Sequence, residues 1–404
     1  MWSRNTYKML FFILDICLLF IISLIGHLSK VPINLNAIML LFLTFIGSWI
    51  LTYRVRYFIF DYYTHTFMTI WWSLFFSASY LFIIKTYGRM FIAIIYLLIT
   101  LIFMITYRFI YARLRQPPIH VLIYQDLRHK LSPHRNVLYH SVQNIDDLKL
   151  KNFDCILFEY GTDYSNDWRK LIAHAQIIGI PVLTPSTLEE YLTGKVSVKE
   201  LNASWIKNSF SINPVYSLIK KIFDIAITLI LLPFLSIISL TIGTLIFICM
   251  GRPIFFSQMR IGQGGKLFKL YKFRTMINSN DLDETSRHDK RITKLGHILR
   301  QYRLDELPQF FNILKNEMSL IGPRPERVDL TEKYTKEIPI YNIRLLVKPG
   351  ISGWSQVMYG YSNGVNGALE KLQYDLFYVK HFSMWIDIRI FFKTIYTIIG
   401  KIGI

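Results

Sequence analysis

The amino-acid sequence predicts a membrane protein in three parts: four transmembrane helices in residues 1–116, a small parallel α/β domain in residues 117–213, and a second α/β domain in residues 214–404 that a re-entrant helix holds on one face of the membrane. Three observations lead to this fold class. Of the 404 residues, 52% are hydrophobic, which is too many for a purely soluble chain. Short strand patterns alternate with a helix pattern in the middle of the sequence. Four long apolar runs precede this region, and a fifth, interrupted by a proline, follows it.

Positive charge gathers in the first and last parts. The formal net charge is +19; residues 1–116 carry ten Lys or Arg against two acids, residues 117–213 ten against ten, and residues 214–404 twenty-six against fifteen. Because the basic residues alternate with apolar runs, we expect anionic lipid and phosphorylated substrates as partners, and we do not expect nucleic acid. The cysteines, Cys17, Cys155 and Cys249, have no metal-ligand spacing, which indicates a reduced, cytosol-facing protein without disulfides.

The first four apolar runs lie at about residues 9–28, 35–52, 67–84 and 90–107. Each is close to the roughly 20 residues that a helix needs to cross a bilayer. No small-residue cleavage site follows the first run, so we expect a retained anchor and not a signal peptide. Seven Lys or Arg lie before the first run, after the second and after the fourth, whereas the opposite loops hold only Lys30, Lys85 and Arg89. The positive-inside rule therefore places the N-terminus and everything after the fourth run in the cytoplasm.

The middle part has the pattern of a small parallel α/β domain. "IHVLIY" (119–124), "FDCILFEY" (153–160) and "IPVLT" (180–184) predict short buried strands, and "WRKLIAHAQIIG" (168–179) predicts a helix. The first strand is followed by "QDLRHKLSPH", which contains no glycine. A dinucleotide-binding turn needs glycine for its tight curvature and for close approach of the phosphate. We therefore expect a degenerate module with a structural or regulatory role.

The fifth apolar run, residues 216–250, is long enough to span the membrane. Pro233 in its middle lacks a backbone N–H and predicts a kink, while nearby Ser and Thr side chains can satisfy the freed backbone groups. Lys220 and Asp224 at its start would stay at the head-group level. These features favour a helix that enters and leaves the same leaflet. A spanning helix with a proline kink is the alternative, and hydropathy alone would favour it.

Two adjacent acids, Asp305 and Glu306, lie in the stretch "RLDELPQFFNILKNEMSLIGPRPE" (303–326). Helix capping is one interpretation, since Asp is a good N-cap residue and acids favour a first turn. Capping does not explain the surrounding arginines. In a basic site, one carboxylate can attack phosphorus and form an acyl phosphate, and the other can hold Mg²⁺ together with substrate phosphates.

Cations surround these acids in the sequence. Strand alternation in "LYKFRTM" puts Lys272 and Arg274 on one face. Together with Arg300, Arg303 and Arg324 they could surround a diphosphate, because Arg grips phosphate oxygens in a fork and Lys acts as a point charge. Each element alone is weak, since scattered charges usually mark a solvated face. Their density beside a membrane-dipping helix favours a phosphate-binding site.

Residues 214–404 resemble the bacterial sugar transferase family, the polyprenyl-phosphate sugar-1-phosphate transferases. "YKFRTM", "LDELPQ", "NEMSLIGPRPE" and "KPGISGWSQV" occur in the family's order, and the four helices and a Rossmann-like middle domain resemble its long form. The resemblance implies that Asp305 is the nucleophile, that Glu306 is a Mg²⁺ ligand, and that Lys272, Arg300 and Arg324 contact phosphate or nucleotide. Asp375 matches a further family acid, and the resemblance implies that it also binds substrate. Two departures are Leu232, which stands where a serine often precedes the proline, and the absence of glycines in the middle domain's first turn.

The resemblance implies transfer of a sugar 1-phosphate from a UDP-sugar to undecaprenyl phosphate, with release of UMP, at the cytoplasmic face of a bacterial inner membrane. This reaction would initiate synthesis of exopolysaccharide, capsule or O-antigen. A multispanning glycosyltransferase with a lipid-linked donor is a rival, but it would need long extracytoplasmic loops, and the loops here are short. A non-enzymatic scaffold of a polysaccharide assembly complex is the other rival. The sequence leaves the sugar and homo-oligomerisation open.

Overall fold

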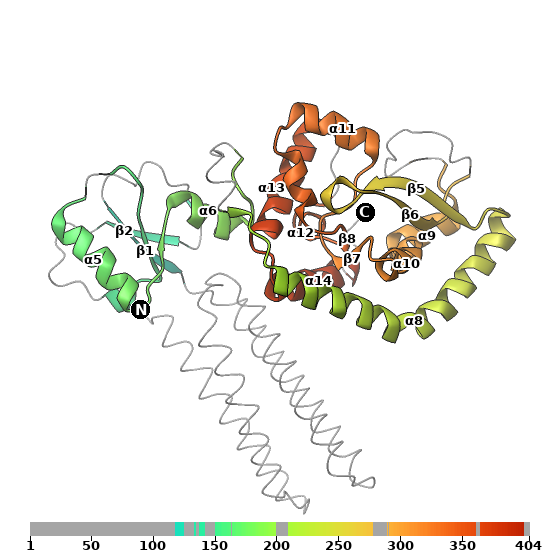
Figure 1. Cartoon of the computed structure of the whole chain (residues 1–404), viewed down its shortest axis with the longest axis horizontal. Coiled ribbons are helices and arrows are strands. Elements are labelled where there is room, and N and C mark those ends of the chain that lie inside the picture. The colour runs from blue at the N-terminus through green and yellow to red at the C-terminus, as the bar shows by residue number, and fades with distance from the viewer. Residues whose placement is uncertain are drawn as a thin grey trace, which may run out of the picture. The chain divides into compact units, whose positions relative to one another are not determined.

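The computed structural model describes residues 118–124, 133–134, 137–141, 150–162, 164–198, 209–277, 289, 291–360 and 364–399 (Figure 1). The four transmembrane helices expected in residues 1–116, and most of the turn after the first strand, lie outside these residues. The chain divides after Leu192 into two compact units. Each unit has hydrophobic cores of its own.

The first unit is built on a four-stranded parallel sheet, which confirms the α/β pattern of the middle sequence. Its strands are β1 (Ile119–Ile123), β2 (Val137–Ser141), β3 (Cys155–Leu157) and β4 (Val182–Leu183), with η2 (Leu150–Asn152) before β3 and the spatial order β2-β1-β3-β4. The strand patterns did not identify β2. It lies at the edge of the sheet, and four of its five side chains are half-buried or exposed, so it lacks an apolar run.

One helix covers each face of this sheet. α5 (Asn166–Ile177) shares a core with the even-numbered side of β1, in which Trp168 and Leu122 are both buried. α6 (Pro185–Thr193) contributes Leu188 to the core on the opposite side. Successive side chains of a strand point to opposite faces, so a five-residue strand can serve two cores.

The second unit contains two pairs of strands. β5 (Phe255–Ile261) and β6 (Leu267–Phe273) form an antiparallel hairpin through η3 (Gln263–Gly265). β7 (Ser319–Ile321) and β8 (Gly350–Ser352) pair in parallel. The turn of the hairpin needs glycine, because Gly264 and Gly265 have φ values of 65° and 79°, a region that other residues enter with strain.

The other described helices of this unit range from 5 to 17 residues in length. They are α9 (Lys294–Gln301), η4 (Leu304–Gln309), α10 (Phe310–Leu314), α11 (Val328–Glu337), η5 (Tyr341–Leu346), α12 (Trp354–Met358), α13 (Gly364–Lys380) and α14 (Met384–Ile399). The main core lies among α11, α12, α13 and α14, where Trp354 stacks on Phe377 with ring centroids 5.6 Å apart. The indole N–H of Trp354 donates to the carbonyl of Gly194 at 2.8 Å. The expected domain boundary at residues 213–214 therefore falls inside this unit.

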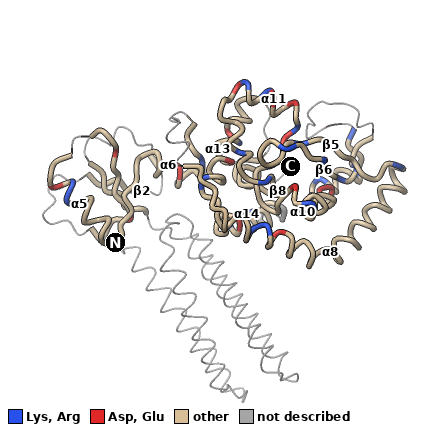
Figure 2. The backbone as a smooth tube through the Cα atoms, viewed as in Figure 1, with Lys and Arg blue, Asp and Glu red and all other residues tan. Residues whose placement is uncertain are grey.

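The second unit also contains the long apolar helix α8 (Pro214–Met250), which is long and apolar enough to cross a membrane; only 11% of its most apolar stretch is buried. Figure 1 shows that α8 bends along its length, and Figure 2 shows charged residues near its two ends and none between. Pro233 lies inside the helix. It accounts for a bend, because proline lacks a backbone N–H and clashes with the preceding turn.

Both ends of α8 pack on the same unit. Near its start, Lys220 forms an ion pair with Asp387 of α14 at 2.5 Å, and Asp224 accepts a hydrogen bond of 2.6 Å from Ser319 of β7. Near its end, Ile246 is fully buried in a core that it shares with β6 and α9. The exposed apolar stretch therefore leaves the unit and returns to it.

Candidate active site

The paired acids lie in η4, directly after a reversal of the chain. Helix α9 ends at Gln301, and Arg303 has a φ of 54°, in the left-handed region that residues with side chains rarely adopt. Asp305 and Glu306 follow, and both are buried. Arg303 occupies the N-cap position of η4, and no side chain caps that helix. Asp305 is therefore not an N-cap residue, although both acids lie in the first turn of η4.

Glu306 is held by two cations from different elements. Lys272 Nζ of β6 and Arg324 Nη2, in the turn after β7, each lie 2.9 Å from Glu306 Oε1. Burial opposes ionisation of Glu306, but Arg324, Lys272 and Arg303 together hold the pKa of its carboxyl well below the usual range. Glu306 is therefore a fixed anion at neutral pH.

Asp305 lies beside this group and is held less tightly. Lys272 Nζ is 3.8 Å from Asp305 Oδ2. Burial raises the pKa of the Asp305 carboxyl, and the neighbouring Glu306 adds to the rise while Lys272 opposes it. The environments thus push the two adjacent acids in opposite directions, which is typical of carboxyl pairs with different roles. Asp305 is the more basic of the two, and Glu306 is the anion that organises the cations.

A rigid turn carries Arg324. The backbones of β7 and β8 meet at Gly322, whose amide donates to the Ser352 carbonyl at 2.9 Å. A Cβ atom at Gly322 would lie 2.2 Å from the carbonyl oxygen of Lys348, so glycine is required for this approach. Pro323 and Pro325 on either side of Arg324 fix φ. The Gly-Pro-Arg-Pro stretch therefore holds the Arg324 backbone in one place.

Arg303 is the third cation of the site. It is half-buried, and burial lowers the pKa of its guanidinium, although Glu306 and Asp305 favour the charged form. Within the part of the chain that the structure describes, no hydrogen bond or ion pair engages its guanidinium. The structure therefore brings Lys272, Arg303 and Arg324 to the two acids, as the sequence predicts.

Arg300 and Arg274 have other hydrogen-bond partners. Arg300 Nε donates to Thr275 Oγ1 at 2.9 Å, although its charge still favours ionisation of Asp305. Arg274 donates from Nη1 to the carbonyl of Arg252 at 2.9 Å and from Nε to that of Met276 at 3.1 Å. β6 ends one residue before Arg274, so the strand alternation that pairs it with Lys272 does not extend to it. The structure places Arg274 on backbone carbonyl groups and not on the acids.

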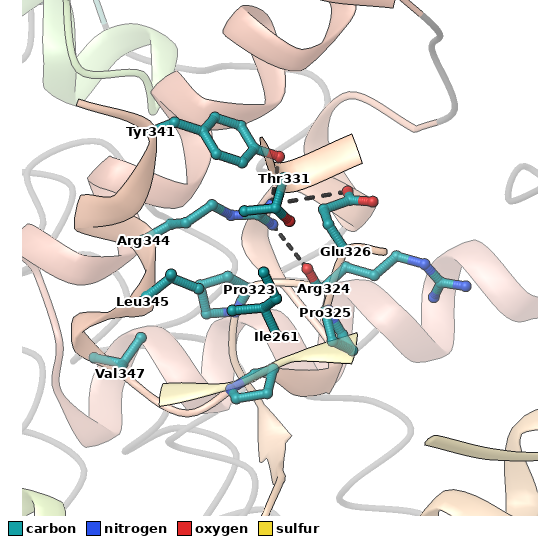
Figure 3. A pocket seen from close by; sticks show the side chains of 11 residues that line it. Ile261, Pro323, Arg324, Pro325, Glu326, Thr331, Tyr341, Arg344, Leu345 and Val347 are labelled. Atoms are coloured by element: carbon teal, nitrogen blue, oxygen red, sulfur yellow. Dashed lines mark hydrogen bonds and ion pairs between the residues drawn. The ribbon is translucent and has the colours of Figure 1, made fainter. Parts of the chain in front are cut away.

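Asp375 of α13 does not contact the paired acids but is connected to Arg324 through Arg344. It is 1% exposed and pairs with Arg344, with Nη2 2.7 Å from Oδ2. The same Arg344 nitrogen donates to the carbonyl of Arg324 at 2.8 Å. Figure 3 shows the Arg324 side chain pointing away from Arg344 while its backbone faces it. Sequence reasoning missed Arg344; the available signal was a single arginine within the apolar stretch "IRLLV".

Glu306 has one oxygen free for a further cation. Its Oε2 is buried without a hydrogen-bond partner, and a donor or a metal ion would satisfy it. Among the described residues, no three or more His, Cys, Asp or Glu side chains lie together in a way that could hold a metal ion. Mg²⁺ binds through one or two carboxylates when substrate phosphates supply other ligands. The site fits Mg²⁺ on that condition.

Comparison with known proteins identifies the second unit. A family model described as bacterial sugar transferase matches residues 215–401. A UDP-N-acetylgalactosamine-undecaprenyl-phosphate N-acetylgalactosaminephosphotransferase from Aeromonas hydrophila is 37% identical over 261 residues, which cover 64% of this chain and 62% of that protein. A UDP-glucose:undecaprenyl-phosphate glucose-1-phosphate transferase from Klebsiella pneumoniae is 37% identical over 190 residues, 46% of this chain and 41% of that protein.

This chain therefore spans less than two thirds of either of these two relatives. A shorter relative is matched almost throughout. The uncharacterized sugar transferase EpsL from Bacillus subtilis (strain 168) is 37% identical over 190 residues, which cover 46% of this chain and 90% of that protein. The matches to the family model and to all three relatives are explained by one assignment: this chain belongs to the bacterial sugar transferase family.

Proposed function

We propose that this protein transfers a sugar 1-phosphate from a UDP-sugar to undecaprenyl phosphate, giving an undecaprenyl-diphosphate-linked sugar and UMP. The observation that carries the proposal is the pair of buried acids, Asp305 and Glu306, with Lys272 Nζ 3.8 Å from the first and 2.9 Å from the second and Arg324 Nη2 2.9 Å from the second. The names of the Aeromonas and Klebsiella relatives support this reaction class. Those names differ in the sugar, so the donor sugar of this protein is open.

In the proposed first step, a carboxylate oxygen of Asp305 attacks the sugar-bearing phosphorus of the donor. The bond from that phosphorus to the bridging oxygen breaks, UMP leaves with the electron pair, and a sugar-phosphoryl aspartate forms. In the second step an oxygen of undecaprenyl phosphate attacks the same phosphorus and releases Asp305. Asp305 suits the nucleophile's role, because its raised pKa makes the ionised carboxylate more basic than Glu306.

The cations would neutralise the diphosphate during both steps. The Arg303 guanidinium forms no hydrogen bond or ion pair with a described residue, and it is the first candidate for the donor's phosphate oxygens. Lys272 and Arg324 already bind Glu306, and they would stabilise the charge that develops on the transferred phosphoryl group. Glu306 would hold Mg²⁺ through its free Oε2, and the ion would supply further charge neutralisation.

The geometry of α8 supports action on a membrane-bound acceptor from one side. Its two ends pack on one unit, while its middle is apolar and exposed. This arrangement fits a helix that dips into one leaflet and returns, at the cytoplasmic face of the inner membrane. The returning end shares its core with β6, the strand that carries Lys272, so membrane contact and the site are joined through one element.

The experiment that tests the proposal uses purified full-length protein in detergent or nanodiscs, a panel of UDP-sugars and radiolabelled undecaprenyl phosphate. We expect one donor to yield UMP and a labelled lipid product in equal amounts. Asp305→Asn is the matched control, because it is nearly isosteric but cannot form the acyl phosphate. It should be folded and inactive.

A membrane scaffold without enzymatic activity makes the opposite prediction. In that case no donor would yield UMP with the wild-type protein, and Asp305→Asn would leave polysaccharide assembly in cells unchanged. Wild-type turnover together with an active Asp305→Asn protein would reject the assigned mechanism while keeping the enzyme class.

A further inference from the structure

The turn that carries Arg324 is tied down through its backbone. Four consecutive carbonyl groups each accept a hydrogen bond: Pro323 from the Gly350 amide at 3.0 Å, Arg324 from Arg344 Nη2 at 2.8 Å, Pro325 from Arg260 Nη1 at 3.1 Å, and Glu326 from the Ile261 amide at 3.3 Å. Two of these donors are backbone amides of neighbouring strands. The other two are arginine side chains, from β5 and η5, and they bind the two carbonyls in the centre of the turn.

The sequence of the turn explains why side chains are needed. Pro323 and Pro325 have no N–H, so the turn cannot enter a regular backbone ladder on both of its edges. Buried carbonyl groups nevertheless require donors. A guanidinium carries several N–H donors in a fixed fork and can satisfy a carbonyl while its other nitrogens bind elsewhere.

Arg344 is held in place from several directions. It is 5% exposed. Its Nη1 donates to the Tyr341 hydroxyl at 2.7 Å and lies 3.8 Å from Glu326 Oε1 (Figure 3). Its Nη2 lies 2.7 Å from Asp375 Oδ2. Asp375 and Glu326 supply the negative charge that a buried guanidinium requires.

Arg260 has fewer polar partners than Arg344. Its Nη2 donates to Gln258 Oε1 at 2.7 Å, and its Nη1 to the Pro325 carbonyl. Burial, with the nearby charge of Arg324, lowers the pKa of Arg260 to about 10, so it stays charged at neutral pH. The Arg260 cation is thus held where burial disfavours its charge. Its hydrogen bonds go to the Pro325 carbonyl of the turn and to Gln258 of its own strand.

We infer that Arg260 and Arg344 are positioning residues for Arg324. They hold the centre of the turn so that the Arg324 guanidinium meets Glu306 and, given the proposed function on which this inference rests, the donor phosphate. Asp375 and Tyr341 bind the nitrogens of the Arg344 guanidinium and so hold it in position. Asp375, predicted from the sequence as a substrate-binding residue, is assigned here to support of the turn.

The test is a double-mutant cycle on full-length protein, read as kcat for UMP release. Arg344→Lys keeps the charge but cannot bind Asp375, Tyr341 and the Arg324 carbonyl together. We expect about a hundredfold loss of kcat, the scale of a 1 Å misplacement of a catalytic group. In an Arg324→Lys background the same change should cost less than threefold. Arg327→Lys, whose side chain pairs with Asp329, is the control and should stay near wild type.

Each outcome decides the inference. A folded Arg344→Lys protein with wild-type kcat overturns it, and so does a loss that is multiplicative with that of Arg324→Lys, since the role would then be independent of Arg324. If Arg344→Lys does not fold, the same cycle with Arg260→Lys decides in the same way. An inactive wild-type protein would instead reject the proposed function on which the inference rests.

Discussion

Gly322→Ala should greatly slow turnover although it leaves every charged group of the site in the sequence. The added Cβ would lie 2.2 Å from the Lys348 carbonyl oxygen and 2.9 Å from the Gly350 amide nitrogen, both of them backbone atoms. The first distance is 1.2 Å short of the 3.4 Å at which ordinary contact begins. Backbone atoms cannot rotate away, so β7 and β8 must separate by roughly 1 Å.

That displacement is transmitted directly to Arg324, which lies two residues after Gly322. Misplacement of a catalytic group by about 1 Å costs about 10²-fold in rate, so we expect kcat for UMP release to fall by that factor. Overpacking costs about 1–3 kcal/mol of stability, so most of the protein should remain folded. Thermal unfolding in detergent and UMP release measured on the same preparation separate the two effects.

Gly243→Ala is the matched control. It is the same substitution in α8, but its Cβ would meet the Ile254 side chain at 3.6 Å, an ordinary contact. Alanine is also favoured over glycine in a helix by about 1 kcal/mol. Turnover should be unchanged in this variant. Wild-type kcat in Gly322→Ala would refute the argument that the close approach of the two strands positions Arg324.

Three further predictions concern the charges and the membrane helix. Lys272→Met should move the acid limb of the kcat/KM profile to higher pH, because Lys272 lowers the pKa of the Asp305 carboxyl and its loss lets that pKa rise. An acid limb at the wild-type pH or at a lower pH would contradict this. Glu306→Gln should raise the Mg²⁺ concentration needed for half-maximal turnover, and unchanged metal dependence would remove Glu306 as a ligand. In a background without native cysteines, Arg252→Cys should be shielded from an impermeant thiol reagent in intact cells, whereas labelling would show that α8 spans the membrane.

Local sequence patterns predicted the first unit well. The runs that became β1, β3 and β4 are apolar, and parallel strands buried on both faces read as continuous apolar runs. β2 was missed because its side chains alternate at an exposed edge. Periodicity cannot detect such a strand, which is defined by pairing with β1 over five residues.

The candidate site was predicted in part, for a physical reason. The structure brings together five charged residues that stand in recognisable local motifs: Asp305, Glu306, Lys272, Arg303 and Arg324. The partners of Arg274 are backbone carbonyls, and no residue pattern encodes a backbone acceptor.

The same limit applies to Arg344 and Arg260. Arg344 is 20 residues along the chain from Arg324, whose carbonyl it binds. Arg260 is 65 residues from Pro325, whose carbonyl it binds. Their role depends on how the chain folds around the turn. Charge and spacing along the sequence could therefore suggest a phosphate site but not the residues that hold its backbone.

The central claim, that Asp305 carries the sugar-phosphoryl group covalently between the two steps, is tested most directly by a single-turnover experiment without acceptor. Full-length protein is mixed with Mg²⁺ and a UDP-sugar labelled in the sugar-bearing phosphate, quenched with acid, digested and mapped by mass spectrometry. We predict a burst of UMP equal to the enzyme concentration and a hydroxylamine-sensitive label on the peptide that contains Asp305, both absent in Asp305→Asn. UMP that forms only when undecaprenyl phosphate is present, with no label on that peptide, would contradict the account.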